Sequence, residues 1–317
     1  MIQDITPRTN CIICNNETTA TNPFSDEHLI PEFLGGGLEL KQCICKNCNS
    51  RMGADFEGRL SNSFLITSFR HTHNIKGKAN ILKSPFQGVY NLPDGTKFRV
   101  THNHTLEALT STIEGPDNNL RVVTDQKNTQ DLESVIKKKI HRKTKYDPHK
   151  KDLSETINNI ISSATHTTIE NPEITINIDI DLNDFDLLFT KITFEAQFYF
   201  LGDHFLSSKD SAQMATALQT CKMSPEIKID MPLPEENILN SIFDSDFHWI
   251  HKQNKIIFIK IHPFSGIVYL NDSNIENIPR TLKFCYKTQS YEEVNIYNQL
   301  AREMRNKRLE ELFNKVP

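Results

Sequence analysis

Near its N-terminus the sequence reads Cys11-Ile-Ile-Cys14, then Ser25-Asp-Glu-His-Leu-Ile-Pro-Glu-Phe-Leu-Gly-Gly-Gly37, then Cys45-Lys-Asn-Cys48. Each C-x-x-C turn points two thiols toward one position, and the 30 residues between the turns suffice for a hairpin that brings the turns together. This spacing predicts a closed, tetrahedral structural zinc site formed by Cys11, Cys14, Cys45 and Cys48. Cys43 is then an extra thiol, because the second turn needs both Cys45 and Cys48. Four unrelated buried thiols are the alternative.

The residues around the two turns predict a strand and a helix. Residues 25–37 place two apolar residues, a proline and a glycine run after Glu27 and His28, which predicts a strand that runs into a loop. Adjacent strand residues point to opposite faces, so Glu27 and His28 can contact different partners. After the second turn, residues 49–57 predict the start of a helix on which Asn49, Gly53 and Glu57 share a face.

These elements together resemble the HNH endonuclease family over about residues 9–60, since C-x-x-C, Glu-His-Leu-Ile-Pro with Leu-Gly-Gly, and C-x-x-C-Asn follow one another in that order. The resemblance implies a ββα-metal fold with a catalytic divalent ion between hairpin and helix. It implies that Glu27 and Asn49 bind this ion and that His28 is the general base. Hard oxygen ligands suit Mg²⁺ or Mn²⁺, whereas the four thiolates suit zinc.

The implied reaction is hydrolysis of a phosphodiester bond with one catalytic metal ion. Neutral His28 would take a proton from the attacking water, while the ion stabilises charge on the phosphate and on the leaving 3′ oxygen. His28 as a buried histidine that merely packs is the alternative. Many HNH sites have a middle Asn on the second strand that orients the base, but residues 34–44 contain no Asn. A backbone carbonyl would then hold the imidazole instead, or activity would be weak.

Composition and charge narrow the remaining function classes. The chain has 317 residues, of which 37% are hydrophobic and 19 are Phe, so it can bury a core. No segment approaches the roughly 18 uncharged apolar residues of a membrane span, and no secretion signal is recognisable, so we expect a cytoplasmic protein without membrane contact. Basic and acidic side chains number 8 and 8 in residues 1–80, 12 and 8 in residues 81–150, and 16 and 24 in residues 151–317. Any contact with nucleic acid should therefore be local.

The middle of the chain predicts a β-hairpin and a basic helix. Residues 88–100 contain an Asp-Gly turn between two strand-like segments, and residues 119–125 predict another strand. Residues 130–145 predict a helix, and a short amphipathic helix is expected near residues 153–164. The helix at 130–145 ends in the densest basic cluster of the sequence: Lys137, Lys138, Lys139, Arg142, Lys143 and Lys145. These side chains bind phosphate or form a solvated face.

The C-terminal part predicts a mixture of helices and strands. An alternating strand is expected at residues 174–182, followed by a helix near 183–202 that is apolar on most sides and should be the core helix of this region. Strands near 246–251, 255–263 and 266–270 predict a meander, and a charged helix is expected near 291–315. No phosphate-binding glycine loop, nucleophile elbow or dinucleotide fingerprint is present.

The sequence thus predicts an α+β protein with three regions. Residues 1–70 form the ββα-metal nuclease head with its Cys₄ zinc site, residues 71–170 a β-hairpin and basic helical middle region, and residues 171–317 an α+β recognition or regulatory domain. The predicted function is a metal-dependent HNH endonuclease that cleaves DNA, in bacterial restriction or phage defence. The alternative is a non-catalytic zinc-knuckle module that binds nucleic acid or protein. Whether the chain forms a homo-oligomer or takes a regulatory partner stays open.

Overall fold

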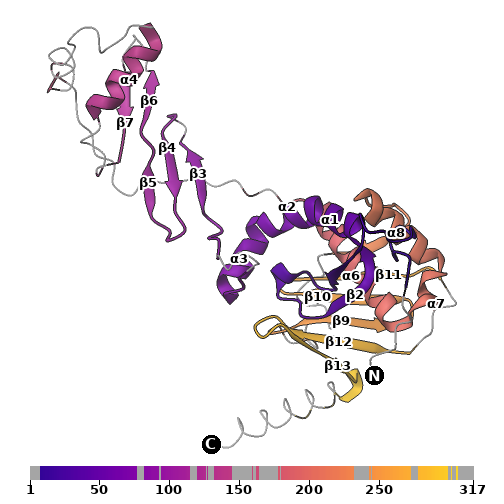
Figure 1. Cartoon of the computed structure of the whole chain (residues 1–317). Coiled ribbons are helices and arrows are strands. Elements are labelled where there is room, and N and C mark those ends of the chain that lie inside the picture. Colours follow the sequence, from indigo (N-terminus) through magenta and orange to yellow (C-terminus); the bar gives the residue numbers. More distant parts are fainter. Residues whose placement is uncertain are drawn as a thin grey trace, which may run out of the picture. The chain divides into compact units, whose positions relative to one another are not determined.

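The computed structural model of the chain describes residues 8–76, 82–92, 94–114, 120–125, 127, 132–144, 159, 162–163, 178, 180–231, 243, 245–272, 278–298, 301 and 305. It divides into two compact units, residues 1–82 with 180–317, and residues 83–179 (Figure 1). The first unit combines the N-terminal head with the C-terminal region. Whether residues 1–70, 71–170 and 171–317 fold as separate domains stays a prediction.

The head is a β-hairpin followed by three short helices. Antiparallel strands β1 (Phe24–His28) and β2 (Glu39–Cys45) flank a 3₁₀ turn at Glu32–Leu34, and helices α1 (Lys46–Ala54), α2 (Phe56–Asn62) and α3 (Phe64–His73) follow. The register pairs His28 with Glu39 and Ser25 with Ile44, so β2 bulges between these pairs, where Gln42 has a φ of 54°. The predicted order of strand, hairpin and helix is confirmed.

The helix after the second cysteine pair is shorter than the sequence predicted. Helix α1 ends at Ala54, and Asp55 has φ and ψ of −89° and −106°, outside the helical region. Glu57 therefore lies in the next helix, α2, and does not continue the face formed by Asn49 and Gly53. The prediction of one continuous helical face was wrong, because a pattern of intervals of four does not reveal a single non-helical residue within it.

The C-terminal part of the first unit consists of helices against a six-stranded antiparallel sheet (Figure 1). Its helices are α6 (Leu182–Leu201), α7 (Asp203–Leu206) and α8 (Lys209–Thr220). The sheet has the order β13-β12-β9-β10-β11-β8, with β8 at Lys228–Asp230, β9 at His248–Gln253, β10 at Ile256–Ile261, β11 at Phe264–Tyr269, β12 at Arg280–Cys285 and β13 at Ser290–Val294. The predicted core helix and the predicted meander are confirmed.

Helix α6 is central because it is apolar almost all round. Its N-cap Asp181 accepts a hydrogen bond from the Asn183 backbone N–H at 2.9 Å, and the chain leaves the helix at Gly202 with a φ of 58°. Phe189, Ile192 and other apolar side chains on several faces are buried. A helix of this kind must be covered on every side, and it contacts α2, α7, α8 and β11.

The two ends of this region were predicted as a strand at 174–182 and a charged helix at 291–315. The charged helix expected from residue 291 was wrong at its start, because β13 occupies Ser290–Val294 and pairs with β12. Cross-strand ion pairs favour the strand: Arg280 Nε lies 2.6 Å from Glu293 Oε1, and Lys283 Nζ lies 3.5 Å from Glu292 Oε1. The rest of that helix lies largely outside the described residues, as does most of the strand predicted at 174–182.

A run of three glycines packs the head against the C-terminal sheet. A Cβ atom on Gly37 would lie 1.7 Å from the Gln289 carbonyl oxygen, and one on Gly35 would lie 2.6 Å from the Tyr286 carbonyl oxygen. Gly35 also has a φ of +83°, which side chains disfavour. Because Tyr286 and Gln289 lie in the connection between β12 and β13, the loop after β1 can approach this connection only as glycine.

The described part of the second unit includes two small antiparallel sheets and helix α4. Strands β3 (Gly88–Asn91), β4 (Lys97–Val100) and β5 (Leu106–Ala108) form one sheet, and β6 (Ser111–Glu114) pairs with β7 (Leu120–Val123). Helix α4 spans Leu132–Thr144. The predicted hairpin, strand and helix of this region are confirmed, whereas the helix expected near 153–164 lies largely outside the described residues. No helix in the described ranges has the length and apolarity that a membrane span requires.

Candidate functional site

The four predicted zinc ligands come together in the head. Their sulfur atoms lie within 4.8 Å of one another, and Cys14 Sγ and Cys45 Sγ are 3.8 Å apart. Tetrahedral zinc with Zn–S bonds of about 2.3 Å separates its sulfurs by about 3.8 Å. We call Cys11, Cys14, Cys45 and Cys48 the four-cysteine cluster; its composition, spacing and burial match a structural zinc site.

Local structure forms this cluster. Cys11 and Cys14 lie in a turn that the Ile12 backbone N–H anchors to the Cys43 carbonyl at 2.9 Å, while Cys45 is the N-cap of α1. The Cys45 backbone N–H donates to Cys11 Sγ at 3.3 Å. Hydrogen bonding from Cys48 lowers the pKa of the Cys11 thiol to about 4, so the cluster favours thiolate at that sulfur.

Cys43 lies apart from these ligands, as the sequence spacing requires. Its thiol is 3.0 Å from the Lys41 carbonyl oxygen, and burial raises its pKa to about 11. A thiol of this kind stays protonated at neutral pH and acts as a small apolar side chain.

Glu27 and His28 point to different surroundings from adjacent positions on β1. Glu27 is 5% exposed and its Oε1 lies 2.7 Å from Lys191 Nζ on α6. The His28 side chain is 25% exposed and faces Glu39 across the hairpin, with 3.8 Å between His28 Nε2 and Glu39 Oε1. The strand therefore separates a buried carboxylate from a partly exposed imidazole.

Lys191 is the centre of a buried ionic cluster. Its Nζ lies 2.7 Å from Glu27 Oε1, 2.7 Å from the His28 carbonyl oxygen, and 3.4 Å from both Glu57 Oε1 and Glu195 Oε2. We call Lys191, Glu27, Glu57 and Glu195 the Lys191 cluster. Lys191 and Glu195 have no exposed surface. One ammonium thus serves three carboxylates that come from β1, α2 and α6.

The charges in this cluster are strongly coupled. Burial by itself would lower the pKa of Lys191, but the three carboxylates outweigh it and raise that pKa above its usual range. Burial raises the pKa of Glu195 well above its ordinary value and also raises that of Glu57, although Lys191 opposes both shifts. Lys191 therefore remains charged, while burial disfavours the charged forms of Glu57 and Glu195.

Asn49 joins α1 to β1. Its side-chain Nδ2 donates to Ser25 Oγ at 3.1 Å and to the Asp26 carbonyl oxygen at 3.0 Å. The amide nitrogen is thus used to dock the helix beside Glu27. Oδ1 is the side-chain atom with the chemistry to bind a cation.

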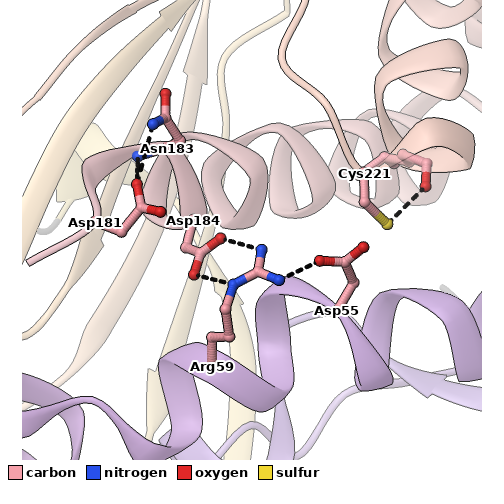
Figure 2. A network of polar contacts seen from close by, with 7 residues as sticks. Asp55, Arg59, Asp181, Asn183, Asp184 and Cys221 are labelled. Carbon is pink, nitrogen blue, oxygen red and sulfur yellow. Dashed lines mark hydrogen bonds and ion pairs between the residues drawn. The ribbon is translucent and has the colours of Figure 1, made fainter.

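Arg59 connects α2 to the first turn of α6 (Figure 2). Its guanidinium donates to both oxygens of Asp184, with Nε–Oδ2 at 2.8 Å and Nη2–Oδ1 at 2.6 Å, and also pairs with Asp55. Bidentate pairs of this kind fix orientation as well as distance. Lys191 follows Asp184 by about two helical turns, so both residues lie on the same face of α6. The Arg59–Asp184 pair therefore turns this face toward α2.

The predicted basic cluster is only partly described and belongs to the second unit. On α4, Lys137 Nζ pairs with Glu133 Oε1 at 2.7 Å and Lys138 is exposed. The side chains of Lys139, Arg142, Lys143 and Lys145 lie outside the described residues. The choice between phosphate binding and a solvated face stays open.

Sequence reasoning missed Lys191 and Glu39 beside the site residues of β1, and it missed Glu195 as a buried neighbour of Lys191 outside the site. A signal for Lys191 and Glu195 was present, because a lysine and a glutamate four residues apart in an otherwise apolar helix must find buried partners. Glu39 had no such signal, since its position opposite His28 follows from the hairpin register.

The comparison with protein families identifies a known domain in the head. Residues 11–65 match the family model described as HNH endonuclease. This range contains the four-cysteine cluster, Glu27, His28, Asn49 and Glu57. No curated protein and no solved structure matches the chain significantly.

Proposed function

We propose that this chain, which carries an HNH endonuclease domain at residues 11–65, is a metal-dependent endonuclease that hydrolyses phosphodiester bonds of DNA. The observation that supports it best is that the family match includes the four-cysteine cluster and a partly exposed histidine, His28, next to the buried carboxylate of Glu27. A role in bacterial restriction or phage defence is part of the proposal, as are phosphate contacts by the basic cluster of α4.

The four-cysteine cluster would hold zinc as a structural ion. Four thiolates leave no open coordination position, so this ion would support the fold and would not activate water. The cluster joins the turn at Cys11–Cys14 to the start of α1, and α1 docks on the strand that carries Glu27 and His28 through Asn49. Zinc would thereby hold α1 in place beside the site.

The residues around Glu27 fit a second, catalytic divalent ion. Glu27 Oε2 is buried and has no hydrogen-bond partner among the described residues, although buried carboxylate oxygens normally have one. Glu27 and the Oδ1 of Asn49 would hold Mg²⁺ or Mn²⁺, which prefer oxygen ligands. Such an ion would supply stabilisation of the negative charge on the phosphate and on the leaving oxygen.

His28 would act as the general base. Its Nδ1 is buried without a hydrogen-bond partner in the described part of the chain, so we assign proton transfer to Nε2. Nε2 takes the proton of the attacking water, and the Glu39 carboxylate at 3.8 Å then stabilises the resulting imidazolium. Glu39 faces the ring from the second strand, where many HNH sites have their middle Asn.

The decisive experiment uses supercoiled plasmid. Purified full-length protein is incubated with plasmid and Mg²⁺ or Mn²⁺, and nicked and linear products are separated on a gel. We expect cleavage that needs the divalent ion and disappears in His28→Ala. A single-stranded RNA of matched length tests the preference for DNA. Absence of cleavage with every ion by protein that contains zinc would refute the proposal.

One observation favours a second candidate, a non-catalytic zinc-knuckle module that binds nucleic acid or protein. The Lys191 ammonium already neutralises Glu27 at 2.7 Å, so this carboxylate has a cation without any metal. Under this alternative the chain binds DNA or protein without cleaving DNA, and His28→Ala changes nothing. The plasmid assay combined with a binding assay distinguishes the two candidates.

A further inference from the structure

The contacts of Lys191 differ in length, and the two shortest are made to Glu27 and His28, the site residues of β1. Its two short contacts, both 2.7 Å, go to Glu27 Oε1 and to the carbonyl oxygen of His28. The contacts to Glu57 and Glu195 are longer, at 3.4 Å each. An ammonium has three N–H donors, so two of the three are used by adjacent residues of one strand.

These two contacts restrain both a side chain and the backbone of β1. The bond to Glu27 holds a side chain, whereas the bond to the His28 carbonyl holds the peptide group from which the imidazole extends. Lys191 itself has little freedom, because it is fully buried and the Arg59–Asp184 pair fixes α6 about two turns earlier. The restraint is therefore transmitted from a rigid helix and not from a mobile side chain.

We propose that Lys191 is a positioning residue of the nuclease site, which holds the Glu27 carboxylate and the backbone at His28 in the geometry for cleavage. The HNH domain is then completed by a helix whose lysine lies 163 residues from His28 in the sequence. This inference rests on the proposed nuclease function. Lys191 has no exposed surface and acts only through the residues of β1.

Two other roles for Lys191 give different expectations. If it served only to join α6 to the head, its loss would lower the amount of folded protein without changing the rate of each folded chain. If it merely neutralised the surrounding acids, Glu195→Gln would change cleavage as well, since Glu195 belongs to the same cluster. Positioning instead predicts that Glu195→Gln is harmless, because both short contacts of Lys191 remain.

The test compares full-length wild type with Lys191→Met, which keeps an unbranched side chain of nearly the same length but removes the ammonium. Zinc per chain, thermal unfolding and DNA affinity are measured first, and single-turnover cleavage is expressed per folded, zinc-containing chain. We expect unchanged zinc content and DNA affinity, and a cleavage rate per folded chain that falls by about 10²-fold, since a displacement of about 1 Å can cost that much. The KM for DNA should stay constant while kcat falls.

Matched variants keep the test decisive. Glu195→Gln is the control and should cleave within about twofold of wild type. If Lys191→Met folds poorly, the double variant Lys191→Met with Glu195→Met removes one charge of each sign from α6 and should show the same loss per folded chain. A wild-type rate per folded chain in either lysine variant overturns the inference while leaving the nuclease proposal intact. A wild-type protein that does not cleave overturns both.

Discussion

The four-cysteine cluster and the Lys191 cluster lie in the same unit but are assembled in opposite ways. The cysteines come from two short turns of the head, and Cys14 and Cys45 are 31 positions apart in the sequence. The Lys191 cluster joins β1 and α2 to a helix that lies far away in the sequence. The first would take its positive charge from a bound metal ion, whereas the second contains its own cation, Lys191. Local spacing can therefore specify a metal site, but a buried lysine finds its acids only through tertiary packing.

Zinc removal should produce the largest effect, because it breaks the locally assembled cluster. We expect close to one tightly held zinc per chain by elemental analysis, and Cys11→Ser or Cys48→Ser should unfold the head. Structural zinc contributes roughly 10–16 kcal/mol of apparent binding free energy in small zinc domains, far more than a single packing contact. Thermal unfolding before and after chelation measures the loss.

Cys43→Ser provides the matched control for that experiment. It removes a buried thiol of the same strand that lies outside the four-cysteine cluster. Zinc content should stay at the wild-type value. Carefully purified wild-type protein without zinc would contradict the structural-zinc proposal directly.

His28→Ala should abolish cleavage while both clusters stay intact. Loss of a positioned general base typically slows a reaction by about 10²–10⁴-fold, and this residue contributes no thiolate or carboxylate to either cluster. Single-turnover cleavage of plasmid measures the rate, with zinc content and DNA affinity as checks on the fold.

Glu27→Ala serves as the contrasting variant. It removes a proposed ligand of the catalytic ion, so excess Mn²⁺ should partly restore its cleavage but should not restore that of His28→Ala. Equal rescue of both variants would show that His28 does not act as the base.

A decrease in pH should lower the free energy of unfolding of the first unit, because His248 of β9 is fully buried and burial disfavours its charged form. His248 Nε2 lies 2.8 Å from the Leu34 carbonyl oxygen, and full burial, with His262 and His73 nearby, lowers the pKa of His248 to about 4. In the unfolded chain His248 becomes protonated near pH 6.5, whereas in the folded chain its lowered pKa delays protonation until about pH 4. The contribution of neutral His248 to the free energy of unfolding is therefore fully present above pH 6.5, and about 3 kcal/mol of it is lost as the pH falls to 4.

Denaturant unfolding at several pH values measures this slope. His248→Gln cannot take up the proton, so its stability should depend less steeply on pH between 6.5 and 4. Comparison with this variant is needed because other groups also contribute to the pH dependence of stability. Burial lowers the pKa of His262 and His73, and raises that of Glu195. Parallel curves for the two proteins would refute the assignment to His248.

The smallest predicted effect concerns the glycine run. Gly37→Ala places a Cβ atom 1.7 Å from the backbone oxygen of Gln289 and should lower the free energy of unfolding by about 1–3 kcal/mol. Gly53→Ala is the matched control, because its Cβ would meet no atom within 4 Å and alanine favours helix α1 by up to about 1 kcal/mol. Chemical denaturation of both variants measures the difference, and equal destabilisation would contradict the packing argument.

Much of the head could be predicted because its signals are local. The C-x-x-C spacing predicted which four cysteines come together, and the polar and apolar order of residues 25–37 predicted the strand that carries Glu27 and His28. The break at Asp55 and the strand β13 escaped prediction for one reason. A non-helical residue and a strand formed against a distant partner both depend on packing, which periodicity does not record.

The sequence by itself determined the thiol cluster, the apolar core helix α6 and the position of His28 next to Glu27, since these follow from spacing and periodicity along a few turns of chain. Only the tertiary structure decided what those residues face. The bulged register of the hairpin places Glu39 opposite His28, and the docking of α6 places Lys191 against Glu27 and the His28 carbonyl. A buried charge takes its partners from whichever segments enclose it, and the enclosing segments are known only once the chain has folded.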